Sequence, residues 1–154
     1  FCLYFMRKPI RINKNNYQIV SPCDGLVTYV DDNKLSIFLS PLDVHWQYTP
    51  IDSTIKDIQI IHGTHNMANT PKSCHNEGVQ VIFTSDYGNI YITQRVGFFV
   101  RRILNIIHKG DFMKQNDPYG IICFGSRVDI ILPTNVTCVL KKKDRVIAGV
   151  TSLI

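Results

Sequence analysis

The chain has 154 residues, of which 45% are hydrophobic and 19% charged, and its formal net charge is +5 at pH 7. This length suits one domain with a buried core, and the composition excludes a disordered, collagen-like or low-complexity chain. No run reaches the ~18 consecutive apolar residues of a membrane-spanning helix. Five cysteines without a Cys-x-x-Cys pair argue against a disulfide framework and favour a reducing compartment.

Short runs rich in Ile, Val, Phe and Tyr follow one another, separated by Asp, Asn, Gly and Pro. In chain order, the predicted strands are 25–30, 35–39, 55–61, 79–84, 89–96, 127–132, 137–140 and 146–149. Residues 97–108 are the one helix candidate, with a strand as the alternative. This spacing predicts a mainly β, single compact sandwich- or barrel-like domain over 1–154, with at most one or two short helices.

Basic residues gather near both ends of the chain, in two clusters: Arg7, Lys8, Arg11 and Lys14, and then Lys141, Lys142 and Lys143. Such clusters suit a solvated face, nucleic acid or an anionic membrane surface. Because no nucleic-acid-binding motif accompanies them, we expect no nucleic-acid partner.

One segment has the residue types of a metal site: His62, His65, Cys74 and His75. Its surroundings are rich in Gly, Asn, Thr and Pro, which is typical of a polar surface loop. We therefore expect no metal.

Three segments carry chemistry beyond scaffolding: 21–25 (Ser-Pro-Cys-Asp-Gly), 40–45 (Ser-Pro-Leu-Asp-Val-His) and 124–129 (Phe-Gly-Ser-Arg-Val-Asp). Read singly, they are a turn, a strand-end histidine and a tight bend. Together they supply Asp24, His45 and Ser126, the residue types of a base-activated nucleophile. Because Gly125 has no Cβ, its carbonyl is open to attack by Ser126, which allows self-cleavage as well as hydrolase chemistry.

These segments resemble the motifs of the phosphatidylserine decarboxylase proenzyme family in its short, pyruvoyl-dependent form. The matching segments are 21–27 to SPADG-x-V, 37–45 to IF(L/M)SPxDVH, 94–103 to QIAGxxARRI and 119–133 to RFGxIxFGSRVDxYLP. The likeness covers nearly the whole chain in order.

The chain also departs from the family pattern. Asn76-Glu77 match the first half of the family's NERN motif, but Gly78 and Val79 stand where that motif has Arg and Asn. Ala148-Gly149 match the start of the family's closing AGET motif, and Val150 replaces its Glu. Tyr48 stands where some members have a second histidine, which we interpret as a subtype difference.

The resemblance implies a zymogen that cuts itself between Gly125 and Ser126, into 1–125 (beta chain) and 126–154 (alpha chain). Ser126 would become an N-terminal pyruvoyl cofactor. His45, oriented and electrostatically supported by Asp24, would take the Ser126 proton. The mature lyase would convert phosphatidylserine, or a related serine phospholipid, to phosphatidylethanolamine.

The resemblance also implies partners. Arg101, Arg102 and Arg127 are candidates for binding the substrate phosphate. The two fragments would remain a heterodimer or form a higher oligomer. We expect a membrane-associated protein facing a reducing compartment, held peripherally or through an N-terminal anchor outside this chain, with residues near 1–14 on the lipid.

Two other functions use the same residues. A serine hydrolase of lipid esters could employ Ser126, His45 and Asp24, although the G-x-S-x-G elbow is missing. A non-catalytic lipid-binding relative would explain the altered NERN and AGET segments.

Overall fold

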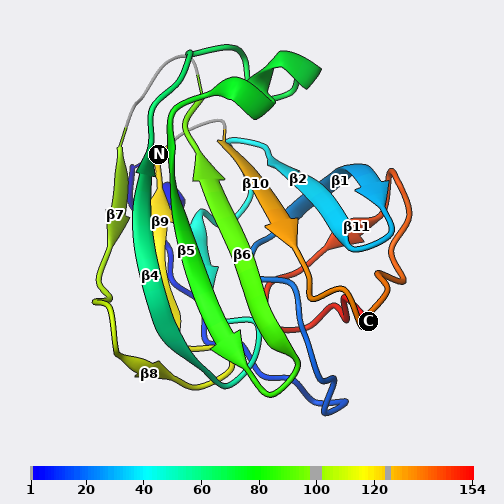
Figure 1. Cartoon of the computed structure of the whole chain (residues 1–154). Coiled ribbons are helices and arrows are strands. Elements are labelled where there is room, and N and C mark those ends of the chain that lie inside the picture. Colours follow the sequence, from blue (N-terminus) through cyan, green and yellow to red (C-terminus); the bar gives the residue numbers. More distant parts are fainter. Residues whose placement is uncertain (1, 98–101, 124–125) are drawn as a thin grey trace.

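Eleven strands in two antiparallel sheets form the framework of the computed structural model, which describes residues 2–97, 102–123 and 126–154 (Figure 1). The large sheet has the order β11-β1-β2-β10-β6-β5-β4-β8, and the small sheet has the order β3-β9-β7. The large-sheet strands are β1 (Gly25–Asp31), β2 (Lys34–Leu39), β4 (Ser53–Ile61), β5 (Gly78–Ser85), β6 (Gly88–Arg95), β8 (Phe112–Met113), β10 (Ser126–Ile131) and β11 (Arg145–Val146). The small-sheet strands are β3 (Trp46–Tyr48), β7 (Ile103–Asn105) and β9 (Pro118–Ile122), and the helices are α1 (Cys2–Phe5) and the short 3-10 helix η1 (Pro71–His75).

The two sheets pack face to face through one apolar core. Tyr119 and Ile122 of β9 belong to the same buried cluster as Phe83 of β5, and the Phe83 and Tyr119 rings meet edge to face with centroids 5.2 Å apart. Figure 1 shows β9 running behind β4 and β5. The prediction of a mainly β sandwich with only short helices is confirmed, and in strands such as β10 alternating residues bury one face.

Six of the eight predicted strands form within two residues of their predicted ends. Two predictions were wrong. Residues 137–140 are irregular and bond to separate segments, with the Cys138 N–H donating to Asp32 and the Val139 N–H to Leu153. The predicted strand 146–149 is limited to Arg145–Val146, after which the chain turns.

The described residues of the helix candidate 97–108 form no helix; a short strand and irregular chain stand there instead. Ile103–Asn105 form β7, which pairs with β9, so the strand alternative is the correct one for these residues. Pairing with the edge of β9 satisfies backbone groups that a helix would satisfy locally, and it leaves Leu104 facing solvent. Residues 98–101 lie outside the described part.

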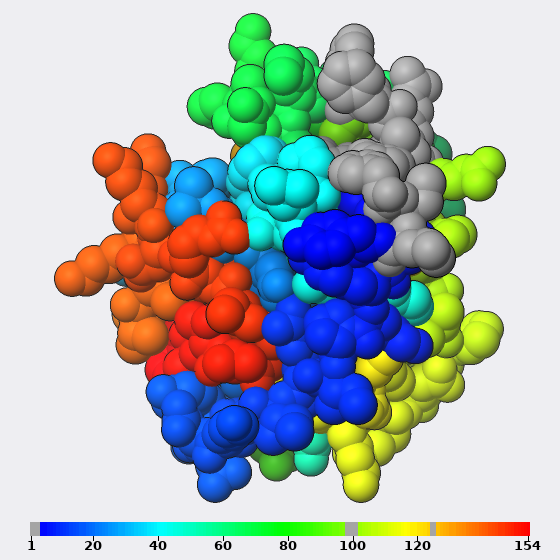
Figure 2. Space-filling model, turned by 180° about the vertical axis from the view of Figure 1, so that it is seen from behind, coloured from blue at the N-terminus to red at the C-terminus, as the bar shows by residue number. Residues whose placement is uncertain are grey.

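The N-terminal segment lies across β3 and the neighbouring residues 40–45. The Trp46 indole donates to the Met6 carbonyl at 3.2 Å, and the Tyr48 hydroxyl donates to the Pro9 carbonyl at 2.7 Å. Figure 2 shows this blue segment beside the cyan residues near 40. Tyr48, at the position of a second histidine in some relatives, therefore anchors the N-terminal segment. No helix in the described ranges is long and apolar enough to cross a membrane.

Candidate active site

Two connections run between the large and the small sheet, and their ends lie next to each other on both sheets. We call them the two crossings. The chain leaves β2 after Leu39 and reaches β3 just past His45, and it leaves β9 after Ile122 and enters β10 at Ser126. Leu39 and Ser126 are register partners on the large sheet. On the small sheet, the Ile122 N–H donates to the His45 carbonyl at 3.3 Å. The two crossings are therefore paired with each other where they leave the large sheet and where they leave the small sheet. His45 and Ser126 accordingly lie on adjacent crossings at the same junction between the sheets.

His45 is buried, and one hydrogen bond decides which ring nitrogen carries the proton. Its Nδ1 lies 2.9 Å from the carbonyl oxygen of Asp43. Because a carbonyl can only accept, Nδ1 carries the proton and Nε2 keeps its lone pair. The Phe5 ring packs against the imidazole, with centroids 4.1 Å apart.

Burial is the largest influence on the pKa of His45 and lowers it from the ordinary value of 6.5. The hydrogen bond to the Asp43 carbonyl and the charges of Asp43 and Asp24 act in the opposite direction, while Arg7 adds to the lowering. His45 is therefore a neutral imidazole with a nitrogen able to accept a proton.

Ser126, the first residue of β10, is also fully buried. Neither its Oγ nor the Nε2 of His45 has a hydrogen-bond partner among the described residues. Buried polar atoms are paired in the great majority of cases, so a hydroxyl and a basic nitrogen without a described partner on two adjacent crossings indicate a candidate reactive site. Gly125, the other half of the predicted cleavage site, lies outside the described part of the chain.

The hydrogen bonds of the Asp24 carboxylate go to residues other than His45. Its Oδ1 accepts the Ala148 N–H at 2.8 Å, and both carboxylate oxygens lie 2.8 Å from Nη2 of Arg11. The bond that orients the His45 ring comes from Asp43 instead. Asp24 thus acts on His45 through its charge, and its carboxylate joins the N-terminal segment to the turn near the C-terminus.

Asp43 is a functional residue that the sequence reasoning missed. Its Oδ2 accepts the Ser40 N–H at 2.8 Å, and its Oδ1 accepts from Nη2 of Arg145 at 2.6 Å. Together with the Asp43 N–H bond to the Ser40 carbonyl, these contacts close a turn that holds the Asp43 carbonyl against His45. The Ser-Pro-x-Asp pattern, a turn with an acceptor side chain, was the available signal.

A row of amides, buried at Gln47 and Gln94 and half-buried at Asn105, lies between the sheets and was also missed. Gln47 of β3 and Asn105 of β7 both pair with Gly120 of β9, where a Cβ would collide with the Asn105 side chain. Asn105 donates to Oε1 of Gln94, on the facing sheet, at 2.9 Å.

Each of these amides keeps one buried atom without a partner in the described residues: Oε1 of Gln47, Oδ1 of Asn105 and Nε2 of Gln94. Gln94 pairs with Val128, which shares the inward face of β10 with Ser126. Polar groups of both donor and acceptor type are therefore available between the sheets, on the side of Ser126.

The three arginines predicted to bind phosphate lie in different places. Arg101 is outside the described residues. Arg102 is exposed, and its carbonyl accepts the Cys123 N–H at 2.9 Å, three positions before Ser126. Arg127 leaves β10 on the face opposite to Ser126.

Of the histidines considered for metal binding, His65 has a carboxylate partner. Nε2 of His65 lies 3.0 Å from a carboxylate oxygen of Glu77. The Asn76 amide donates to the carbonyls of Asn66 and Val96 and so closes this loop. Within the described ranges, no group of three or more His, Cys, Asp or Glu residues could hold a metal ion.

Comparisons with known proteins show the family of the chain. A family model described as phosphatidylserine decarboxylase matches residues 1–153. The phosphatidylserine decarboxylase proenzyme of Ehrlichia ruminantium (strain Gardel) is 35% identical over 99% of this chain and 74% of its own length. Those of Streptomyces avermitilis and Chlorobium chlorochromatii are each 34% identical over 98% of this chain, and over 72% and 77% of their own lengths. No solved structure shows a significant match.

The matched region takes in both crossings, the amide row and every described candidate residue. The chain is therefore an enzyme of the carboxy-lyase class. It belongs to the phosphatidylserine decarboxylase family, whose relatives here are named as proenzymes, and the resemblance carried by its motifs is confirmed.

Proposed function

We propose that this protein decarboxylates phosphatidylserine, or a related serine phospholipid, to phosphatidylethanolamine after cutting itself between Gly125 and Ser126. The observation that carries the proposal is a pair of buried atoms on the two crossings that have no hydrogen-bond partner among the described residues: the Oγ of Ser126 and the Nε2 of His45. A hydroxyl and a neutral imidazole are the two groups that self-cleavage at a serine requires.

The cleavage is an acyl shift followed by an elimination. His45 accepts the Ser126 hydroxyl proton as Oγ attacks the Gly125 carbonyl; the C–N bond then breaks, leaving an ester and a free amine. Loss of the proton on Cα of Ser126 expels the Gly125 carboxylate and leaves dehydroalanine. Tautomerisation to an imine and hydrolysis, with loss of ammonia, convert residue 126 to a pyruvoyl group.

The residues present fit such a cofactor. Ser126 begins a strand with hydrogen-bonded neighbours on both sides, and its buried side chain shares the inward face of β10 with Val128, the register partner of Gln94. A bound pyruvoyl group supplies a carbonyl that condenses with the substrate amine and accepts the electrons released by decarboxylation, which no ordinary side chain can do. We assign to His45 the return of a proton to Cα, and to Nε2 of Gln94 a hydrogen bond to the substrate within the site.

The two products of cleavage are expected to remain together. The fragment 126–154 supplies β10, which lies between β2 and β6, and β11, which pairs with β1. Separating the fragments would open the middle of the large sheet and expose Val128 and Ile130, which are buried. A heterodimer of the two fragments therefore follows from the strand order.

The N-terminal segment supports a membrane-facing role. The exposed fraction is 54% for Tyr4, 49% for Met6 and 90% for Ile10, and the basic residues Arg7 and Lys8 lie among them. Exposed apolar side chains beside cations are typical of a surface that rests on anionic lipid. Arg102, exposed near the chain that leads into Ser126, is our candidate for the substrate phosphate.

Mass measurement under denaturing conditions tests the proposal, together with carbon dioxide release from phosphatidylserine vesicles. The wild type should show two fragments in place of the 17.6 kDa chain, whereas Ser126→Ala should remain intact and inactive. Ser85→Ala, a hydroxyl lost from a hairpin, is the matched control and should process normally.

Other outcomes would identify the alternatives. Carbon dioxide release by the intact chain would overturn the cofactor assignment. An uncut protein labelled at Ser126 by a fluorophosphonate would be a lipid hydrolase. Vesicle binding with neither cleavage nor carbon dioxide release would indicate a non-catalytic relative.

A further inference from the structure

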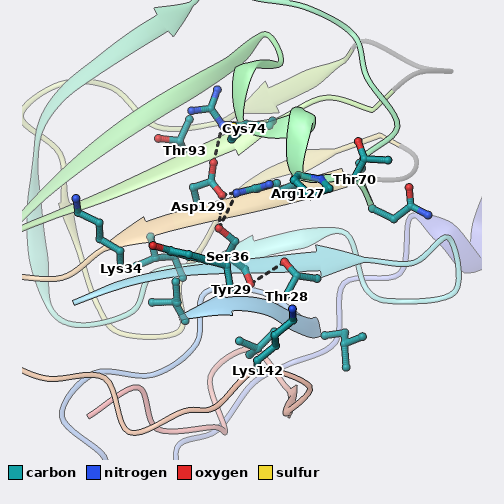
Figure 3. Close-up of a pocket in the computed structure, with 18 of the residues that line it drawn as sticks. Thr28, Tyr29, Lys34, Ser36, Thr70, Cys74, Thr93, Arg127, Asp129 and Lys142 are labelled. Atoms are coloured by element: carbon teal, nitrogen blue, oxygen red, sulfur yellow. Dashed lines mark hydrogen bonds and ion pairs between the residues drawn. The ribbon is translucent and has the colours of Figure 1, made fainter. Parts of the chain in front are cut away.

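A cleft of about 820 Å³ lies on the outer face of the large sheet, away from the small sheet (Figure 3). Side chains of β1, β2, β10 and β6 line it, together with residues 68–71 and Cys74 of η1. Arg127 and Asp129 of β10 point into it, whereas Ser126 and Val128 face the core. The cleft is therefore separate from the candidate active site, which lies on the opposite face of β10.

The floor of the cleft holds two guanidinium groups and one carboxylate. Asp129 accepts from Nε of Arg127 and from Nε of Arg95, both at 2.6 Å, and from Oγ of Ser36 at 2.7 Å. The arginine side chains are 12% and 16% exposed and that of Asp129 is 19% exposed. One positive charge thus remains uncompensated in a largely buried position, where opposite charge is favoured.

Both arginines keep N–H groups available. A guanidinium has five, and Arg127 uses one each toward Asp129, Ser36 and Ser73. Arg95 uses one toward Asp129 and one toward the Asn76 carbonyl. Within the described part of the chain, the remaining N–H groups are free to bind an oxyanion.

The rim adds three further cations, Lys34, Lys142 and Lys143, all exposed. None of these three lysines forms an ion pair with a described residue. Five basic side chains and one acidic one, Asp129, line the cleft, a formal balance of +4. Leu26 and Ile131 give the same cleft an apolar part.

We propose that this cleft binds a phosphate ester, with the phosphate on the arginine floor and lysine rim and the organic part against the apolar lining. Guanidinium forks suit phosphate oxygens, and a balance of +4 favours an anionic ligand. The volume lies within the range of small-ligand sites. The phosphate belongs either to a soluble ester or to a lipid headgroup, and this binding does not require self-cleavage.

Charge-matched variants test the proposal. The triple variant Lys34→Gln, Lys142→Gln and Lys143→Gln removes the rim, and Lys56→Gln, Lys114→Gln and Lys141→Gln removes three exposed lysines outside the cleft. Calorimetric titration with glycerol 3-phosphate, and co-flotation with phosphatidylcholine vesicles containing phosphatidylglycerol, should each be made on the full chain. Affinity should fall about tenfold or more in the rim variant, change less than about twofold in the control, and weaken with salt.

The two probes distinguish the sources. A rim-dependent response to glycerol 3-phosphate assigns the cleft to soluble esters, and one confined to vesicles assigns it to headgroups. Equal affinity of the rim and control variants, or no binding of either probe by the wild type, would overturn the proposal. Because the rim variant should still process at Ser126 like the control, failure here is distinguishable from failure of the proposed function.

Discussion

Ser126 and Arg127 are consecutive residues of β10 whose side chains lie on opposite faces of the large sheet. Ser126 is buried between the sheets with its hydroxyl unpartnered among the described residues, whereas Arg127 lies in the outer cleft and bonds to Asp129. The alternation of a strand separates them, so the predicted role of Arg127 in binding substrate phosphate beside Ser126 has no geometric support. Besides forming the floor of the cleft, Arg127 holds β10 in place through its contacts with Asp129, Ser36 and Ser73.

Asp129→Asn tests this positioning role. Neutralising the carboxylate leaves two guanidinium groups close together, so the free energy of unfolding should fall by about 2–3 kcal/mol. This loss is smaller than that for breaking a fully buried ion pair, because these side chains are partly exposed. Asp86→Asn, at an exposed hairpin position, should change it by less than about 0.5 kcal/mol. Urea unfolding of both variants in the Ser126→Ala background, where no cleavage occurs, measures the difference. Equal stability of the two would show that the network does not hold β10.

His45→Gln should slow self-cleavage by about 10²- to 10⁴-fold, because glutamine preserves polarity and approximate size but cannot accept the Ser126 proton. The rate is measured as the intact fraction over time after synthesis. His62→Gln, at an exposed loop position, is the matched control and should process at the wild-type rate. Normal processing in His45→Gln would remove His45 as the base for cleavage.

Burial lowers the pKa of His45, and the sign of the pH effect follows from that direction. Between the lowered pKa and 6.5 the unfolded chain binds more protons than the folded one at this residue. This contribution to stability is therefore fully present above pH 6.5 and is lost as the pH falls towards the lowered pKa. His45→Gln should reduce the decline in urea midpoint on acidification, relative to the wild type.

The same direction governs the cleavage rate. Since the neutral imidazole is the active form, the rate should reach half its maximum below pH 6.5. A midpoint at or above 6.5 would mean that the folded protein does not lower this pKa.

The pair Gln94 and Asn105 is expected to serve the substrate. Replacing both by Leu removes two amides together, which should leave stability near the wild-type level or raise it. The processed variant should decarboxylate about 10²-fold more slowly if a donor to the substrate is lost. Asn13 and Gln115 form a similar amide pair elsewhere, and their double Leu variant should keep its turnover per folded molecule. Undiminished turnover in the first variant would exclude Gln94 from the site.

Local pattern was enough for the long strands and for the motif residues. Alternating apolar residues predicted β2, β5 and β6, since each buries one face whatever its partner is. The local pattern failed at Ile103–Asn105, where pairing with β9 makes the segment a strand. It also failed at 137–140, whose backbone hydrogen bonds go to two distant segments instead of one neighbouring strand. Those outcomes depend on neighbours that are remote in the sequence.

The sequence by itself determined that this is a β-sheet decarboxylase of the proenzyme family, because its motifs carry Asp24, His45 and Ser126 in a recognisable order. Only the tertiary structure decided what surrounds them. The Asp43 carbonyl orients His45, while Asp24 binds Arg11 and influences His45 through charge. Such assignments depend on which backbone groups and charges come within a few ångströms after folding, and spacing along a chain does not specify them.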